Sequence, residues 1–413
     1  MRLALIYGGR SSEHEVSLQS AAAIYKALAP ERYRVIPIAQ DREGGFWTGP
    51  ALARALASAA PQLPPLGEAP PHHTCAAHEN GRAEGGIDGA VHASDDDKNA
   101  SWAVYARFDL QHPGFWVPAT QTDLPVDMAF PIVHGSFGED GTLQGLLEMM
   151  GIPYVGAGVA ASAVGMDKSL MKALFARAGL PVLPWATVTR LAWEKDRAVT
   201  ESRIVREVGF PCFVKPADRG SSVGVHKVRQ EEDLPDALAR AFVYSGKVVV
   251  ERSAEQCAEV ECAVLGNENP LTSVVGEIRT RHEFYDYEAK YQDDLSELII
   301  PAPLSEPVVR RVQEVAAAAF RVTDCAGMAR VDFFVARDTG DVFLNEINTL
   351  PGFTRFSMYP KLWEATGLPF GRLLDRLVEL GQQAFAEKNR NLYRYSPKAE
   401  EDAVRTVRYG GRS

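Results

Sequence analysis

The sequence predicts an α/β protein of two or three domains with a parallel sheet in its N-terminal third. Apolar runs alternate with helical segments from the first residues onward, which is the pattern of parallel strands joined by helices. The length of 413 residues exceeds what one compact core usually holds. Hydrophobic residues make up 46% and charged residues 24%, and these fractions indicate a globular protein.

The first strand–helix unit carries a clear signal. Leu3–Tyr7 is an apolar run that predicts a buried strand, and a helix is expected over Val16–Leu28. The segment between them opens with Gly8 and Gly9 and contains Glu13. Ligands of parallel α/β sheets bind where a strand passes into the next helix, so this loop is a candidate site. It lacks the G-x-G-x-x-G pattern, which disfavours a nucleotide-dependent oxidoreductase.

The pattern weakens between the strands expected at Tyr33–Ala39 and Met128–Val133. We interpret about residues 49–124 as an insertion, because Pro61–Asp97 is rich in small and polar residues and poor in large apolar ones. It contains four potential metal ligands, but no second cluster has metal spacing, so a solvated loop is favoured. These ligands are His72, His73, Cys75 and His78.

The remaining two thirds predict further helices and strands, followed by a polar tail. A helix is expected over Leu143–Met150, and another is capped by Asp167 and ends near Ala178. An apolar stripe at helical spacing runs from Val308 to Val322, and a closing helix spans Leu373–Phe385. Strands are expected at Phe210–Lys215, Val225–Val228, Lys247–Arg252, Glu259–Leu265, Leu271–Ile278, Met328–Val335 and Val342–Ile347.

Composition excludes several functional classes. The net charge of −10 disfavours broad binding to nucleic acid or to anionic membranes. No run is long and apolar enough to span a bilayer, and the first apolar run is too short for a signal peptide. The five cysteines are scattered, odd in number and without a C-x-x-C pair, which indicates buried reduced thiols and a cytoplasmic location.

The last two predicted strands carry the most specific chemical signal, because they form a hairpin with acids inside apolar runs. Side chains alternate along a strand, so Arg330 and Asp332 share one face, and so do Glu346 and Asn348. If these faces coincide, two carboxylates and an amide oxygen converge, a set that suits Mg²⁺ beside substrate phosphates. The alternative is an exposed hairpin with scattered charges, which the cost of unpaired acids among apolar residues disfavours.

A second candidate site follows the strand that ends at Lys215. The loop Pro216–Gly224 contains two glycines and two serines, whose N–H groups can surround phosphate oxygens beside the Lys215 ammonium. The loop joins two strands, so it is not a P-loop. Lys168 offers a second cation, and Glu251 and Glu259 offer acceptors for an adenine amine and ribose hydroxyls. Taken alone, the loop with Lys215 is about as consistent with a plain flexible turn, and an ordinary surface acid is the favoured interpretation of Glu251 and of Glu259.

In chain order these motifs resemble the ATP-grasp superfamily and, within it, the D-alanine–D-alanine ligases. The resemblance covers most of the chain outside about residues 49–124 and the tail. It implies an N-terminal parallel α/β (pre-ATP-grasp) domain over 1–138, two ATP-grasp lobes over 139–249 and 250–388, and a polar tail over 389–413. The matching segments are Gly8–Ser17, His134–Gly141, Met166–Lys168, Phe213–Gly224, Tyr285–Tyr291, Gly327–Asp332 and Asn345–Gly352.

The resemblance implies that ATP activates one D-alanine as an acyl phosphate, which a second D-alanine attacks to give D-alanyl-D-alanine for peptidoglycan precursors. Asp332, Glu346 and Asn348 would hold two Mg²⁺ ions, for which Mn²⁺ could substitute. The ATP-binding residues implied by the resemblance are Lys168, Lys215, Ser222, Glu251, Arg252 and Glu259.

The resemblance also implies the amino-acid site. Glu13 would bind the ammonium of the first D-alanine and join a triad with Ser221 and Tyr291. Arg330 and the backbone N–H of Gly352 would form an oxyanion hole. The residues implied at the pocket for the second D-alanine are Lys290, Ser357 and His134.

Two alternatives and the partners complete these expectations. Relatives that join D-alanine to D-lactate tend to replace this tyrosine, so the resemblance implies that Tyr291, in an intact YDYEAKY segment, favours an amine acceptor. The alternative within the fold is a ligase that joins D-alanine to D-lactate or D-serine. An inactive ATP-binding module is disfavoured because every implied metal and phosphate position is filled. The resemblance implies a homodimer, and the negative charge and the lack of a bilayer-spanning run predict no nucleic-acid or membrane partner.

Overall fold

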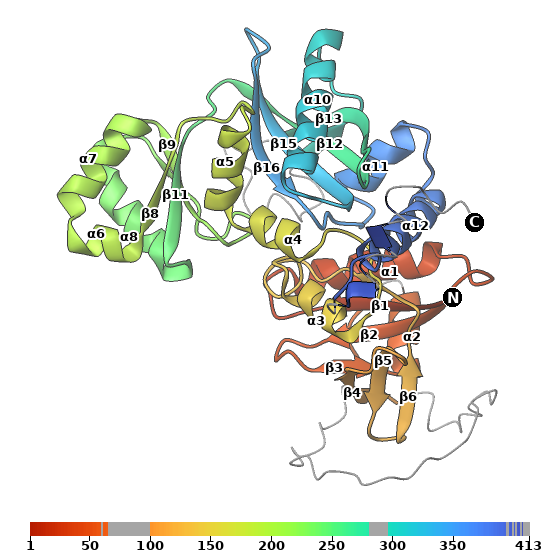
Figure 1. Cartoon of the computed structure of the whole chain (residues 1–413). Helices are drawn as coiled ribbons and strands as arrows, with labels where there is room; N and C mark the ends of the chain where they lie inside the picture. The colour runs from red at the N-terminus through yellow and green to blue at the C-terminus, as the bar shows by residue number, and fades with distance from the viewer. Residues whose placement is uncertain are drawn as a thin grey trace.

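The computed structural model describes residues 1–58, 61–64, 100–280, 296–393, 396–398, 400, 403–404 and 407. Within them the strands form three sheets of seven, four and five strands, which follow one another along the chain (Figure 1). The α/β class is confirmed. Lys290, Tyr291 and the segment Tyr285–Tyr291 lie outside the described residues, as do His72, His73, Cys75 and His78.

The first sheet has the strand order β6-β5-β4-β3-β2-β1-β7 within the described residues. β2 and β7 flank β1 and run parallel to it, whereas β3 to β6 are joined as an antiparallel series. The strands are β1 (Arg2–Gly8), β2 (Arg34–Gln40), β3 (Phe46–Thr48), β4 (Trp102–Arg107), β5 (Gly114–Val117), β6 (Thr122–Pro125) and β7 (Met128–Pro131).

The expectation of a parallel sheet is therefore correct only for β2, β1 and β7. The described part of the presumed insertion contains helix α2 (Pro50–Ala57) and strands β4, β5 and β6, which extend the sheet by antiparallel pairing. These strands have only four to six residues, and several of their side chains are exposed. Short strands with one solvated face lack the continuous apolar run of a parallel strand, so the sequence pattern predicts a loop where the structure has strands.

One helix, α1, joins β1 to β2, and three helices, α3, α4 and α5, connect the first sheet to the second. Asp167 caps α5, as predicted, because its carboxylate accepts hydrogen bonds from the backbone N–H groups of Ser169 and Leu170 at 3.0 and 3.1 Å. The helices are α1 (His14–Ala27), α3 (Thr142–Met150), α4 (Val159–Met166) and α5 (Lys168–Arg177).

The second sheet is antiparallel, with the order β10-β9-β11-β8, and has its own buried cluster. In Figure 1 it lies with its helices to one side of the other two sheets. Its elements are β8 (Trp185–Thr189), α6 (Arg190–Lys195), α7 (Arg197–Glu207), β9 (Cys212–Pro216), β10 (His226–Val228), the 3₁₀ helix η2 (Glu231–Asp233), α8 (Leu234–Tyr244) and β11 (Lys247–Arg252).

The third sheet is also antiparallel, in the order β14-β13-β12-β15-β16. The predicted hairpin is β15 paired with β16. The elements of this part are β12 (Cys257–Gly266), β13 (Leu271–Thr280), β14 (Ser296–Ile299), α10 (Glu306–Val322), β15 (Gly327–Ala336), β16 (Val342–Asn348), α11 (Met358–Ala365) and α12 (Phe370–Lys388).

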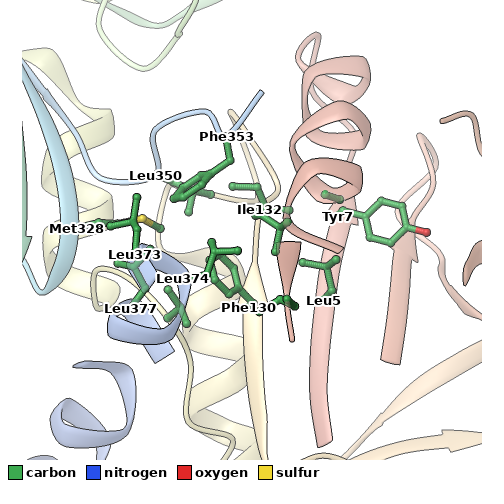
Figure 2. Packing of buried hydrophobic residues seen from close by; sticks show 14 of the residues in the cluster. Leu5, Tyr7, Phe130, Ile132, Met328, Leu350, Phe353, Leu373, Leu374 and Leu377 are labelled. Carbon is green, nitrogen blue, oxygen red and sulfur yellow. The ribbon is translucent and has the colours of Figure 1, made fainter. Parts of the chain in front are cut away.

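One buried cluster joins the first sheet to the C-terminal elements (Figure 2). Phe130 of β7 meets Phe353, which follows β16, with ring centroids 6.1 Å apart in an edge-to-face arrangement. Leu373, Leu374 and Leu377 of α12 belong to the same cluster. This packing fixes the segment after β16 against the first sheet. The segment therefore becomes a neighbour of the loop after β7, although the two are remote in sequence.

The predicted domain limits at residues 138 and 249 stay a prediction. Buried side chains of α3 pack with the first sheet, whereas those of α5 pack with the third.

Among the described cysteines, four are free thiols: Cys212, Cys257, Cys262 and Cys325. None of the described helices is long and apolar enough to cross a membrane.

Candidate active site

Three neighbouring strands of the third sheet carry a row of acids. Glu261 of β12 lies opposite Asp332 of β15, and Asp332 lies opposite Glu346 of β16. Residues paired across strands project from the same face, so the two faces of the hairpin coincide. Glu261 is absent from the sequence-based set, although its spacing of two from Glu259 on one strand was an available signal.

Arg330 lies among these acids. Its Nε and Nη2 lie 2.8 and 2.7 Å from the two carboxylate oxygens of Asp332, and its Nε lies 3.0 Å from Oε2 of Glu261. Burial alone would lower the pKa of Arg330, but the facing Asp332 and Glu261 carboxylates raise it well above the usual value. The guanidinium is therefore a permanent, oriented cation beside the carboxylates.

The donor chemistry of the hairpin fits a magnesium site. Asp332 and Glu346 supply carboxylate oxygens, and Asn348 donates a hydrogen bond from its side-chain Nδ2 to Oδ2 of Asp332 at 2.9 Å. No group of three or more His, Cys, Asp or Glu side chains with metal-site geometry occurs in the described part of the chain. A small set of hard oxygen donors that leaves positions for phosphates and water is the arrangement that Mg²⁺ prefers.

Lys168 connects this hairpin to the glycine–serine loop. Its ammonium donates to the carbonyl oxygen of Arg219 at 2.9 Å and lies 3.5 Å from Oε2 of Glu346. Its backbone N–H donates to the carbonyl oxygen of Ala217 at 2.8 Å. The predicted phosphate-binding loop and the predicted metal strand therefore share one cation.

Glu251 is the centre of a buried charge cluster. Its side chain is only 2% exposed, and Nζ of Lys215 lies 2.7 Å from its Oε2. Lys172 of α5, which the sequence analysis missed, forms an ion pair with Oε1. Burial alone would raise the pKa of Glu251, but the two lysines lower it, so the carboxylate stays ionised. The position of Lys172 four residues after Lys168 was the available signal.

Two further predicted ATP-binding residues, Glu259 and Arg252, have different surroundings. Burial alone would lower the pKa of Lys215, but the carboxylates of Glu251, Glu346 and Glu259 raise it. The guanidinium of Arg252 instead points toward the end of α7, where its Nε donates to the carbonyl oxygen of Val208. Only the backbone of Arg252 is held in the sheet, through a 2.9 Å hydrogen bond to the carbonyl oxygen of Pro184.

The glycine–serine loop reaches the first sheet through Ser221. The Ser221 hydroxyl donates to Oε1 of Glu13, so the structure brings together two members of the expected triad. Ser221 and Ser222 have φ angles of +49° and +59°, a left-handed conformation that non-glycine residues seldom adopt. Glu13 is the N-cap residue of α1, but its carboxylate makes no capping hydrogen bond and instead accepts from Ser221 of the loop.

His134 holds the segment after β16. A carbonyl oxygen can only accept, so His134 carries its proton on Nδ1 and donates to the carbonyl oxygen of Leu350 at 3.2 Å. The Ser20 hydroxyl then donates to Nε2 at 3.2 Å and accepts from the backbone N–H of Phe353 at 3.2 Å. Burial lowers the pKa of His134, which keeps the ring neutral. The predicted contact of His134 with substrate stays a prediction.

Gly352 lies in the segment that His134 holds. A Cβ at this position would lie 2.6 Å from Oγ of Ser357, so the close approach requires glycine. Oγ of Ser357 accepts from the backbone N–H of Thr354 at 3.0 Å. The structure therefore brings Gly352 and Ser357 into one tight turn, next to the loop that carries His134.

Glu139 is a further acid that the sequence-based set omitted. Burial and the nearby negative charge of Glu13 raise its pKa to about 8, although the backbone N–H of Gly135 donates to its carboxyl group. Lys168 and Glu346 also act on it electrostatically. Glu139 therefore carries its proton at neutral pH and adds no negative charge beside Glu13.

We expect Glu139→Gln to become more stable relative to the wild type as pH rises from about 4.5 to about 8. The folded carboxyl keeps its proton up to about pH 8, whereas the unfolded one loses it near 4.5. The contribution of Glu139 to the free energy of unfolding is therefore fully present below about pH 4.5 and is lost as pH rises through about 8. Thermal unfolding of both ligand-free proteins across this range checks the expectation, which parallel stability curves would contradict.

The fold and site define a class of protein. A mixed first sheet precedes two antiparallel sheets, and lysines with acids gather between those two, as in ATP-dependent enzymes of the ATP-grasp fold. Comparison with family models identifies the family. Residues 2–157 match the model described as the D-ala D-ala ligase N-terminus, and residues 174–379 match the D-ala D-ala ligase C-terminus. The chain belongs to the D-alanine–D-alanine ligase family, which confirms the resemblance.

Individual relatives agree with this assignment. The chain is 44% identical to a D-alanine–D-alanine ligase of Heliobacterium modesticaldum, over 96% of this chain and 98% of that protein. Among solved structures, the D-alanine–D-alanine ligase of Coxiella burnetii has 32% identity and a TM-score of 0.73, covering 94% of this chain and 97% of that chain. The VanG D-Ala:D-Ser ligase of Enterococcus faecalis has 32% identity and a TM-score of 0.76, covering 92% and 99%.

Proposed function

We propose that the protein uses ATP to join two D-alanine molecules into D-alanyl-D-alanine. The γ-phosphoryl group passes to the carboxylate of the first D-alanine, which gives an acyl phosphate and ADP. The free amine of the second D-alanine then attacks the acyl carbon, and inorganic phosphate leaves. A carboxylate is a poor electrophile, so phosphorylation supplies the leaving group that amide formation needs.

The contacts of Lys168 carry this proposal. One ammonium touches the glycine–serine loop at Arg219 and also lies 3.5 Å from Glu346, so it stands between a phosphate-type loop and a carboxylate-lined hairpin. Phosphoryl transfer depends mainly on positioning and on neutralising the phosphate oxygens. Lys168 and Lys215 would supply the neutralising charge. Asp332, Glu346 and Asn348 would hold Mg²⁺, which would further neutralise the phosphates when bound.

The hydrogen bond between Ser221 and Glu13 supports an amino-acid site beside these two residues. Glu13 would bind the ammonium of the first D-alanine, and Ser221 would tie the loop to it. Closure of this loop would exclude water, which otherwise hydrolyses an acyl phosphate. Arg330 and the N–H of Gly352 would stabilise the oxyanion of the tetrahedral intermediate. Lys290, Ser357 and His134 would surround the second D-alanine.

Phosphate release from ATP tests the function. The purified protein with Mg²⁺ is expected to release phosphate with D-alanine but not with L-alanine, and to form D-alanyl-D-alanine that mass spectrometry identifies. Phosphate release that needs no amino acid, or that occurs equally with L-alanine, would reject the proposal.

Tyr291 sets the prediction for the second substrate. We expect Tyr291→Phe to raise the use of D-lactate relative to D-alanine, because the hydroxyl would no longer join the triad that orients the amine acceptor. Product analysis with mixed D-alanine, D-serine and D-lactate across a range of pH measures this ratio, with the wild type as control. An unchanged ratio at every pH would remove Tyr291 from that role. A wild type that prefers D-serine would establish the alternative function within the fold.

Three further expectations belong to this proposal. The enzyme would act in the cytoplasm, where its free thiols stay reduced and peptidoglycan precursors are made. It would use two Mg²⁺ ions, with Mn²⁺ as a substitute. It would form a homodimer, and sedimentation velocity tests that point.

A further inference from the structure

We propose that Lys172 is a positioning residue that fixes Glu251 for recognition of the adenine amine and thereby sets the preference for ATP. This inference deepens the proposed function, since it rests on ATP being the nucleotide and on Glu251 facing its base. It gives a role to a buried lysine that the reaction described above does not use.

Lys172 is held on two sides by groups from different sheets. Its side chain, only 1% exposed, forms an ion pair with Oε1 of Glu251 on β11 of the second sheet. Its ammonium also donates to the carbonyl oxygen of Asn345 on β16 of the third sheet, at 3.1 Å. Lys172 itself belongs to α5, whose Met171 and Phe175 are buried in the core of the third sheet. The Lys172 ammonium therefore connects β11, which carries Glu251, to β16, which carries Glu346.

Burial gives this contact its importance. An ionised side chain is costly to bury unless opposite charges and hydrogen bonds surround it. Glu251 meets both conditions, since Lys172 occupies Oε1 and Lys215 lies 2.7 Å from Oε2. Each carboxylate oxygen can accept two hydrogen bonds, so the carboxylate keeps capacity for one more donor at each oxygen. The 6-amino group of adenine is such a donor.

The side chains of Lys215 and Lys172 differ in how far they can move. Lys215 follows directly into the glycine–serine loop and would turn toward the nucleotide phosphates once ATP binds. Lys172 lies on a packed helix and is fixed by Asn345, so it remains with Glu251 in either state. Without Lys172, the Glu251 carboxylate would follow Lys215 toward the phosphates and lose its alignment with the base.

The test compares two nucleotides that differ only at the recognised group: ATP and purine riboside triphosphate, which lacks the 6-amino group. Direct binding of each to the full-length protein gives the preference as a ratio of Kd values. We expect Lys172→Met to reduce the wild-type preference for ATP about tenfold, the usual share of a hydrogen bond to a charged group. Lys172→Gln, which keeps a donor without the charge, is measured in parallel in case the methionine variant does not fold.

Two comparisons separate positioning from general support. Arg177→Met removes an exposed charge from the same helix and is expected to leave the preference unchanged. Glu251→Gln should lose the preference, and Lys172→Met/Glu251→Gln should lose no more than Glu251→Gln alone. If the Lys172 variants raise the Kd of both nucleotides by the same factor, the proposal is overturned, because Lys172 then only supports the structure.

Failure of this inference can be told apart from failure of the proposed function. A wild type that binds both nucleotides equally would overturn the adenine contact of Glu251, and with it the role of Lys172, while ligation of D-alanine could still be observed. Absence of ligation, in contrast, leaves the ratio of Kd values measurable, and a loss of that ratio in Lys172→Met would still support the role.

Discussion

Replacing Arg330 with alanine is expected to lower kcat by about 10²–10³. The variant loses the cation that would face the developing oxyanion, while the predicted ATP-binding residues remain, so the affinity for ATP should change little. In this structure Nε and Nη2 of the guanidinium donate to Asp332, and Nε also lies 3.0 Å from Oε2 of Glu261. Steady-state kinetics with separate titrations of ATP and D-alanine measure both effects.

Two variants distinguish catalysis from folding. Arg337→Ala removes an arginine one residue beyond β15, where it lies 2.8 Å from Glu277 and away from the acid row. It should retain near-normal kcat. Arg330→Lys keeps the charge but not the forked geometry, and it should recover only part of the lost rate. Near-normal turnover of a folded Arg330→Ala protein would exclude Arg330 from the oxyanion hole.

Replacing Glu346 with glutamine is expected to raise the Mg²⁺ concentration for half-maximal activity by about tenfold or more. Glutamine keeps the size of the side chain and one oxygen, but it removes the negative charge that a divalent cation requires. The KM for D-alanine should change much less, because Glu346 would face the nucleotide rather than the amino acid. Activity is titrated with Mg²⁺ at fixed concentrations of ATP and D-alanine.

Glu297→Gln is the matched control, since Glu297 is an exposed acid of the same sheet, on β14. Its Mg²⁺ titration should follow that of the wild type. If the Glu346→Gln titration also coincides with the wild type, the hairpin is not the metal site. Asp332→Asn would then be expected to behave normally as well.

Local sequence patterns were sufficient to predict much of the candidate site. The alternation of side chains on β15 and β16 predicted that Asp332 and Glu346 share a face, and the pairing of the two strands places them opposite each other. A hairpin is a short-range structure, so its register follows from the sequence around one turn. The charge and spacing of Lys168, Lys215 and Glu251 could likewise be read from single segments.

Residues that act through distant partners could not be found in this way. Glu261 matters because β12 pairs with β15, and that pairing joins strands about 70 residues apart. Lys172 and Ser20 look like ordinary helix residues until the sheets bring Glu251 and His134 to them. The antiparallel extension of the first sheet was missed for a different reason, because its short strands with one solvated face carry no continuous apolar run.

The sequence by itself determined the class of fold, the family and the kinds of side chain in the candidate site, because these follow from local periodicity and from motifs within single segments. Tertiary structure alone decided which charges neutralise one another. Ion pairs such as Lys172 with Glu251, and the contact between Ser221 and Glu13, form only after the sheets pack together. Burial then makes each pairing consequential, since an unmatched charge away from water is costly.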